Sequence, residues 1–179
     1  MIKLILNADA SIKLSKISLI EELADAFVII LTKEVYEEQV VVGLKKGYSD
    51  AKRVDTLVKS QKIEVIEVAS TYDDHKLGKG ERSVIDCWLS VGADLVVSDD
   101  EAFLRVLDRI SIPYTPVAGS ILMLVRHGRL TKRDGIKYLN SLKYMIREEH
   151  LFYVNSWKGS THRVHFFKCS IGSTHRVQL

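Results

Sequence analysis

The chain has little cysteine and no long hydrophobic run, and both absences bear on where it works. Its two cysteines, Cys87 and Cys169, lie far apart in unlike surroundings, which favours free thiols in a reducing compartment. No stretch approaches the roughly 20 uninterrupted apolar residues that a membrane helix needs. A signal peptide begins with a positively charged segment followed by a long apolar run. Here a single Lys3 precedes a short apolar run. We therefore expect a cytoplasmic protein without a membrane segment.

Most of the chain also lacks an excess of positive charge. The formal net charge is +3, from 26 basic and 23 acidic residues. Residues 150–179 hold no acid and four of the basic residues, so the remainder has a net charge of −1. This balance excludes a generally basic nucleic-acid binder, and any polyanion must be held locally or through metal. We expect one domain over residues 1–150 and a basic C-terminal extension over 151–179, whose role the sequence does not decide.

Short apolar runs alternate with helical patterns along the chain. The predicted strands are residues 2–6, 27–31, 63–68, 95–97 and 110–114, the last placed at a sheet edge by Pro113. The predicted helical segments are 12–23, 33–46, 49–60, 80–91, 100–107, 117–127 and 132–147. Such alternation predicts an α/β fold, a three-layer α/β/α sandwich around a parallel sheet of about five strands.

Acidic residues directly follow two of the predicted strands. Asp9 comes just after the first strand, and Asp99 and Asp100 come just after the fourth. Ligands of open α/β sheets bind outside the carboxyl ends of strands, so neighbouring strands would bring these carboxylates to one crevice. Oxygen ligands that repel one another suit a hard cation such as Mg²⁺ or Mn²⁺. The alternative is that Asp9 and Asp100 only cap the helices that follow.

Four further acids have structural interpretations when taken singly. Glu81, at the start of its predicted helix, would complement the helix dipole. Glu37 and Glu38 are typical of a solvated helix face, and periodicity does not choose between them. Asp86 follows Glu81 by five residues and falls on a different helix face, which indicates a structural role.

Taken together, five segments spanning about residues 1–145 resemble the PIN-domain nucleases, in particular the VapC-like toxins. The segments are LILNADASIKL (4–14), LTKEVYEEQV (31–40), LGKGERSVID (77–86), ADLVVSDDEAF (93–103) and IPYTPVAGSILMLVRHGRL (112–130). The resemblance implies that four acids are the catalytic metal ligands: Asp9, Glu38, Glu81 and either Asp100 or Asp99. The family's spacing from Val35 favours Glu38, and its spacing from Ser98 favours Asp100 over Asp99.

The resemblance also implies an activity and partners. It predicts a divalent-metal-dependent endoribonuclease that uses Mg²⁺ or Mn²⁺, the toxin of a toxin–antitoxin pair, with a small antitoxin protein as partner and a homodimeric state. The alternatives are an RNA-processing nuclease without an antitoxin and a catalytically silent PIN-like RNA-binding or scaffold module. Candidate residues for holding the RNA substrate are Ser11, Lys13, Arg105 and Arg129.

Overall fold

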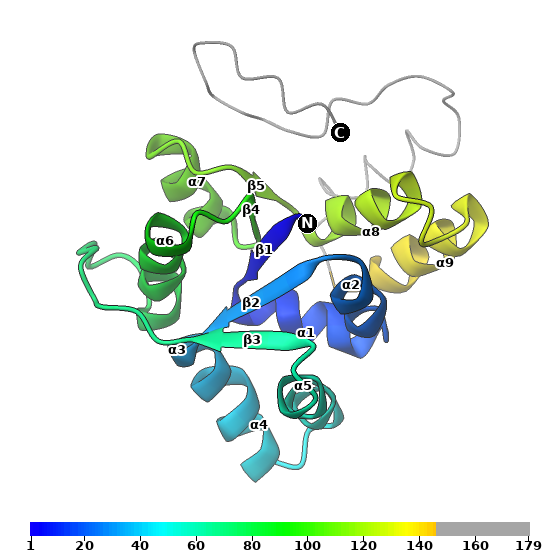
Figure 1. Ribbon diagram of the computed structural model, residues 1–179, viewed down its shortest axis with the longest axis horizontal. Coiled ribbons are helices and arrows are strands. Elements are labelled where there is room, and N and C mark those ends of the chain that lie inside the picture. Colours follow the sequence, from blue (N-terminus) through cyan, green and yellow to red (C-terminus); the bar gives the residue numbers. More distant parts are fainter. Residues whose placement is uncertain (146–179) are drawn as a thin grey trace.

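A computed structural model describes residues 1–145 and shows a parallel sheet between two layers of helices (Figure 1). The strands are β1 (Lys3–Leu6), β2 (Val28–Thr32), β3 (Ile63–Ile66), β4 (Leu95–Val97) and β5 (Tyr114–Thr115). They are all parallel and lie in the order β3-β2-β1-β4-β5. Leu6 of β1 pairs with Val97 of β4, so the two strands that precede the aspartates end side by side. The predicted fold class is confirmed.

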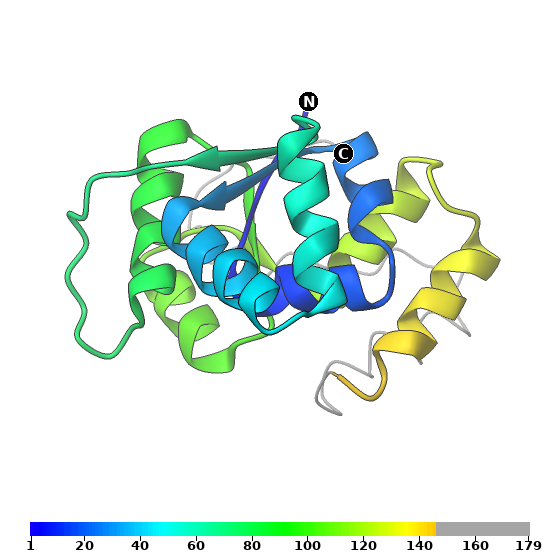
Figure 2. The ribbon, with the colours of Figure 1, turned by 90° about the horizontal axis from the view of Figure 1, so that it is seen from below.

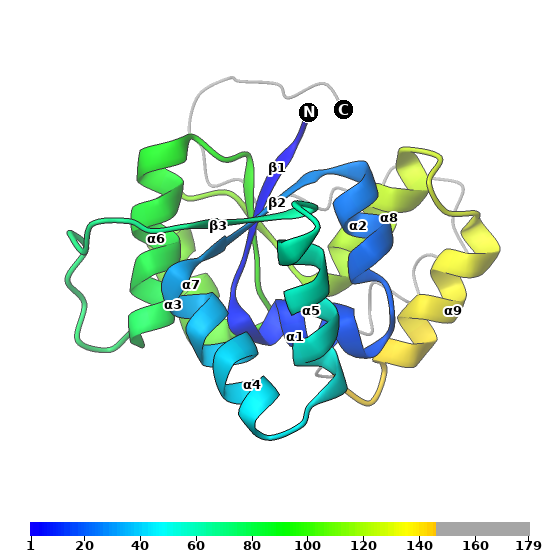
Figure 3. The same cartoon turned by 60° about the horizontal axis from the view of Figure 1, so that its bottom comes forward.

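The helices follow the strands in chain order. They are α1 (Ala8–Lys16), α2 (Ile20–Ala26), α3 (Lys33–Tyr36), the π-helical turn η1 (Glu37–Val41), α4 (Val42–Lys45), α5 (Ser49–Lys59), α6 (Lys79–Val91), α7 (Glu101–Arg109), α8 (Val117–Arg126) and α9 (Lys132–Leu142). Helices α6 and α7 cover one face of the sheet, while α2, α5 and α8 lie on the other (Figures 1 and 3). The central strands are therefore covered on both faces, while edge strand β3 is partly exposed.

The core runs through the centre of the sheet. Leu4, Ile5 and Leu6 of β1 are fully buried, as a central strand covered on both faces requires. Cys87 of α6 is also buried, and burial raises the pKa of its thiol to about 11. Cys87 is therefore a core residue rather than a nucleophile.

Two predicted elements differ from the structure because serines adopt left-handed backbone conformations. The helical pattern over 12–23 is divided at Ser18, whose φ of 56° ends α1 before α2 begins. Helix α7 runs to Arg109 and is followed by Ser111 at φ 59°, so β5 begins at Tyr114 rather than near residue 110. Strand β5 does lie at the edge of the sheet, as Pro113 predicts.

The segment from α3 to α4 is one helical run with a wider turn inside it. Thr32 caps its start, because its hydroxyl accepts a hydrogen bond from the Val35 N–H at 3.2 Å. Gly47, at φ 74°, follows its end. The π-helical turn between them carries both Glu37 and Glu38, the two glutamates between which helical periodicity does not choose.

Two predictions fall partly or wholly outside the described residues. The last helix was predicted to reach residue 147, and α9 ends at Leu142 within the described part. The extension at 151–179, with the second cysteine, lies beyond residue 145. Over residues 1–145, none of the helices combines the length and the apolar character that crossing a membrane requires.

Candidate functional site

A cavity of about 230 Å³ opens at the carboxyl edge of the sheet. In Figure 3 the lower end of β1 lies among α1, α3, α6 and α7, and these elements surround the cavity. Its lining residues are Asn7, Ala8, Asp9, Val35, Glu38, Gly78, Gly80, Glu81 and Asp100. Four of the five predicted acids therefore meet at one cavity, although they come from four separate segments of the chain.

One wall of the cavity, here called the Asp side, carries Asp9 and Asp100 beyond the ends of β1 and β4. Asn7 and Ser98 join the two strand ends, because the Asn7 Nδ2 donates to the Ser98 Oγ at 2.8 Å. The Asn7 Oδ1 accepts from the Ala10 N–H at 2.9 Å, and the Ser98 Oγ accepts from the Asp100 N–H at 3.1 Å. Both linking side chains are buried, so they fix the backbone from which the two aspartates project.

Asp9 has a cationic neighbour. The Lys13 Nζ lies 2.6 Å from the Asp9 Oδ2 and 3.1 Å from the Asp99 Oδ2. Burial lowers the pKa of Lys13, but its hydrogen bond to Asp9 and the negative charges of Asp99 and Asp9 outweigh this effect. The net result is a pKa above the usual 10.5, so Lys13 remains an ammonium ion.

The two consecutive aspartates after β4 take different places. Asp99 is buried outside the cavity lining, where its Oδ1 accepts from the Val117 N–H at 2.9 Å. Asp100 lines the cavity and caps α7, its Oδ1 accepting from the Phe103 N–H at 2.9 Å. The cap uses one of its two carboxylate oxygens, so capping and a role in the cavity are compatible. Of the two alternatives, Asp100 is the residue placed among the other acids.

The opposite wall, here called the Glu side, carries Glu38 on η1 and Glu81 on α6. Thr32 and Ser83 tie the supporting elements together, with 2.7 Å between their hydroxyl oxygens. Ser83 also donates to the Gly80 carbonyl at 2.7 Å. Because Thr32 caps α3 while Ser83 lies in the first turns of α6, this buried contact holds the segments that present the two glutamates.

Gly80 lets the Glu38 carboxylate come close to the start of α6. A Cβ added to Gly80 would meet the Glu38 Oε2 at 2.9 Å, closer than real Cβ atoms approach other heavy atoms. The Glu81 Oε2 accepts from the Gly78 N–H at 2.8 Å, which closes the first turn of the helix. The missing side chain at position 80 thus makes room for a second carboxylate beside Glu81.

Crowding of acids changes the titration of Glu81. Burial raises its pKa above the usual 4.5, the hydrogen bond from Gly78 opposes this, and the charges of Asp100 and Glu38 raise it further. Over residues 1–145, no lysine or arginine forms an ion pair with Glu38 or Glu81. Within the described residues, the Glu side therefore holds negative charge that no lysine or arginine offsets.

The donor set suits a hard divalent cation. All four acids supply carboxylate oxygen, and the space beside Gly80 is occupied by a carboxylate where a methyl group would exclude it. Within the described chain, no three of the His, Cys, Asp or Glu side chains already stand together as a ready ligand cluster.

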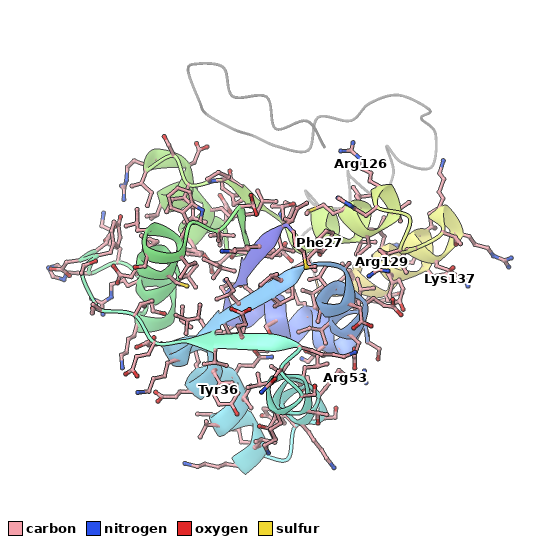
Figure 4. All side chains as sticks on the ribbon, in the orientation of Figure 1. Phe27, Tyr36, Arg53, Arg126, Arg129 and Lys137 are labelled. Carbon is pink, nitrogen blue, oxygen red and sulfur yellow. The ribbon has the colours of Figure 1, made fainter. Side chains whose placement is uncertain are left out.

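The residues predicted to hold substrate are scattered. Ser11 is buried outside the cavity lining, and its Oγ has no hydrogen-bond partner within residues 1–145. Arg105 pairs with Glu101 on α7 at 2.9 Å and does not line the cavity. Arg129 donates to the Asp25 carbonyl just before β2, at the opposite edge of the sheet, and Figure 4 shows it near Phe27. Lys13 alone contacts an acid of the cavity.

Asn7 is the lining residue that the sequence interpretation missed. It is the first residue after β1 and so satisfies the same strand-end rule that selects Asp9. Its amide spans the Asp side, which makes it a positioning residue.

Asp86 has the structural role predicted for it. Its carboxylate accepts from the Tyr72 N–H at 2.8 Å and from the N–H and hydroxyl of Thr71. Figure 2 shows the loop between β3 and α6 passing along the outside of α6 before it returns to the start of that helix. Asp86 fastens this loop, which ends at the Gly78 N–H of the Glu side.

Comparison with known proteins adds one finding. Residues 3–155 match the model of the DUF3368 family, which is described as a PIN domain. No curated protein matches the chain.

Proposed function

We propose, from the premise that this chain belongs to the PIN-domain family, that it is a divalent-metal-dependent endoribonuclease acting at the acidic cavity. PIN domains are generally nucleases, which gives the class of reaction. The observation that carries the proposal is the convergence of Asp9, Glu38, Glu81 and Asp100 on one cavity. Carboxylates gathered on the Glu side, where residues 1–145 supply no cation, are suited to hold Mg²⁺ or Mn²⁺.

Each side chain has a part in the proposed hydrolysis. Glu38, Glu81 and Asp100 would hold the ion, which when bound lowers the pKa of water and offsets charge on a scissile phosphate. A carboxylate of the cavity accepts the proton of the attacking water. Asn7 and Ser98 keep the Asp side in place, and Thr32 with Ser83 keeps the Glu side in place. No side chain needs to form a covalent bond to the substrate.

RNA as the substrate and a toxin role are the finer parts of the proposal, and the sequence resemblance supports them. A toxin would have a small antitoxin partner and would act as a homodimer. A short reading frame directly upstream, whose product binds this chain and stops cleavage, is the expected genetic arrangement. Cleavage without any such neighbour would favour an RNA-processing nuclease.

The test is cleavage of total cellular RNA by the full-length protein with added Mn²⁺. Glu81→Gln keeps an oxygen that accepts from the Gly78 N–H, and we expect its rate to fall by roughly 100-fold. The matched control is Glu64→Gln, an exposed acid on edge strand β3, which should cleave at the wild-type rate. Equal rates for wild type and Glu81→Gln would contradict the proposed site, and absence of cleavage by wild type with any divalent ion would contradict the nuclease.

One observation favours a second function, a catalytically silent binding module. The Lys13 ammonium already neutralises Asp9, which leaves fewer carboxylates for a metal ion. A silent module would bind RNA equally well with and without Mn²⁺ and would not cleave it. Binding measured by fluorescence anisotropy beside the cleavage assay separates the two functions.

A further inference from the structure

Lys13 occupies an unusual position for a buried ion-pair partner. Its side chain is 14% exposed and lies between two carboxylates of very different exposure, Asp99 at 2% and Asp9 at 45%. Asp99 alone would satisfy a structural lysine. The shorter contact, 2.6 Å, nevertheless goes to Asp9, the acid that lines the cavity.

The second carboxylate fixes where the ammonium stands. Asp99 is held in turn by the Val117 N–H at the start of α8, so it cannot follow Lys13 outward. Asp99 therefore holds the Lys13 ammonium on its buried side, and a second hydrogen bond of the ammonium goes to Asp9. A buried ammonium with one fixed partner stays close to any second carboxylate within reach, because leaving it would expose an uncompensated charge.

We propose that Lys13 is a built-in cation that competes with the divalent metal ion for Asp9 and so sets the metal affinity of the cavity. The inference rests on the proposed function. The Asp9 Oδ2 is engaged by the ammonium, so a metal ion held by Glu38, Glu81 and Asp100 would find at Asp9 one oxygen beside a positive charge, and would gain both oxygens only by displacing Lys13. The positive charge of Lys13 also repels a cation at the Asp side. Lys13 is thus a positioning residue that acts through Asp9.

Titration of the full-length protein with Mn²⁺ in a calorimeter, without RNA, tests this. Lys13→Met removes the charge and keeps a long side chain, and we expect Mn²⁺ to bind about tenfold more tightly. Lys13→Arg restores a cation and should return the affinity to within about threefold of wild type. The matched control is Lys16→Met, an exposed lysine on the same helix, which should leave the affinity unchanged.

Asp9→Asn shows whether the gain passes through Asp9. In the wild-type background the change should alter Mn²⁺ affinity by less than about threefold, and in the Lys13→Met background it should remove the whole gain. If Lys13→Met fails to fold because the buried Asp99 carboxylate loses its ammonium neighbour, the pair Lys13→Met with Asp99→Asn removes both charges and keeps an oxygen for the Val117 N–H. This pair should also bind Mn²⁺ more tightly.

The outcomes separate the two proposals. Equal or weaker Mn²⁺ binding by the folded Lys13 variants overturns the competition, even where wild type cleaves RNA. Tighter binding by Lys13→Met in a protein that never cleaves RNA supports the competition and overturns the nuclease. An equal gain in the Lys16→Met control would show a general charge effect and overturn the specific role of Lys13.

Discussion

The two walls of the cavity carry the same number of carboxylates but balance their charge differently. On the Asp side, Asp9 contacts the Lys13 ammonium at 2.6 Å. On the Glu side, Glu81 accepts a backbone hydrogen bond and has no cationic partner among residues 1–145, and its pKa is raised by burial and by neighbouring acids. The comparison teaches that acids with similar placement at strand and helix ends are not equivalent. An added cation would therefore offset more uncompensated negative charge on the Glu side than on the Asp side.

The largest expected effect compares the two walls directly. Glu38→Gln should lower RNA cleavage by roughly 100-fold, because it removes a carboxylate that has no cation within the described protein. Asp9→Asn should lower cleavage by only about tenfold, because Asp9 shares its oxygen with Lys13. Initial rates at saturating Mn²⁺ measure both. A larger loss for Asp9→Asn than for Glu38→Gln would reverse the ranking of the two sides.

A smaller effect is expected from closing the space on the Glu side. Gly80→Ala places a methyl group 2.9 Å from the Glu38 Oε2 and should lower cleavage by about tenfold by moving that carboxylate. The melting temperature should hold or rise, because alanine is the better helix residue. Lys79→Ala in the same turn is the control and should leave the rate unchanged. Full activity in Gly80→Ala would mean that Glu38 need not approach α6.

The supports of the two walls can be compared through stability. Ser98→Ala leaves the buried Asn7 amide and the Asp100 N–H without their acceptor, so we expect a loss of about 2 kcal/mol of unfolding free energy. Ser83→Ala should cost about 1 kcal/mol, because the hydroxyl that it removes accepts no backbone N–H. Urea denaturation measures both, with the exposed Ser90→Ala as control. The reverse order would place the tighter support on the Glu side.

The smallest expected effect is a gain in stability on removing a charge. A raised pKa means that ionised Glu81 opposes folding, so Glu81→Gln should slightly stabilise the metal-free protein at pH 7. The effect should be absent at low pH, where the carboxyl is protonated in both states. It should appear as the pH rises from 4.5 through the higher folded pKa. A stability difference that does not change with pH would argue against this electrostatic origin.

Much of this arrangement follows from the sequence. Apolar runs bounded by polar residues predicted four of the strands closely and placed the fifth a few residues too early. Strand-end placement selected Asp9 and the Asp99–Asp100 pair, and the strands that precede them do pair, Leu6 with Val97. The choice within that pair depends on which side chain faces the cavity and which faces the start of α8. Such a difference of direction between consecutive residues is set by tertiary packing.

Two other features of the site do not follow from helical periodicity alone. Glu38 lies in a π-helical turn, where the spacing of a regular helix no longer tells which side chain points inward. The contact between Lys13 and Asp9 joins residues one helical turn apart, a spacing that in most helices is only a surface pair. Asp99 also contacts Lys13 and lies 86 residues further along the chain. This third residue is buried, so the pair of Lys13 and Asp9 extends into the protein interior.

The hydrogen bond from the Val117 N–H to Asp99 gives α8 a mechanical connection to the cavity. Asp99 receives α8 on one oxygen and Lys13 on the other, and Lys13 contacts Asp9. Three charged side chains thus form one continuous line of contacts from the start of α8 to the cavity. Helix α9 packs against α8 on the far side from the acids. The outer helices are therefore linked to a carboxylate of the cavity through side chains as well as through the backbone.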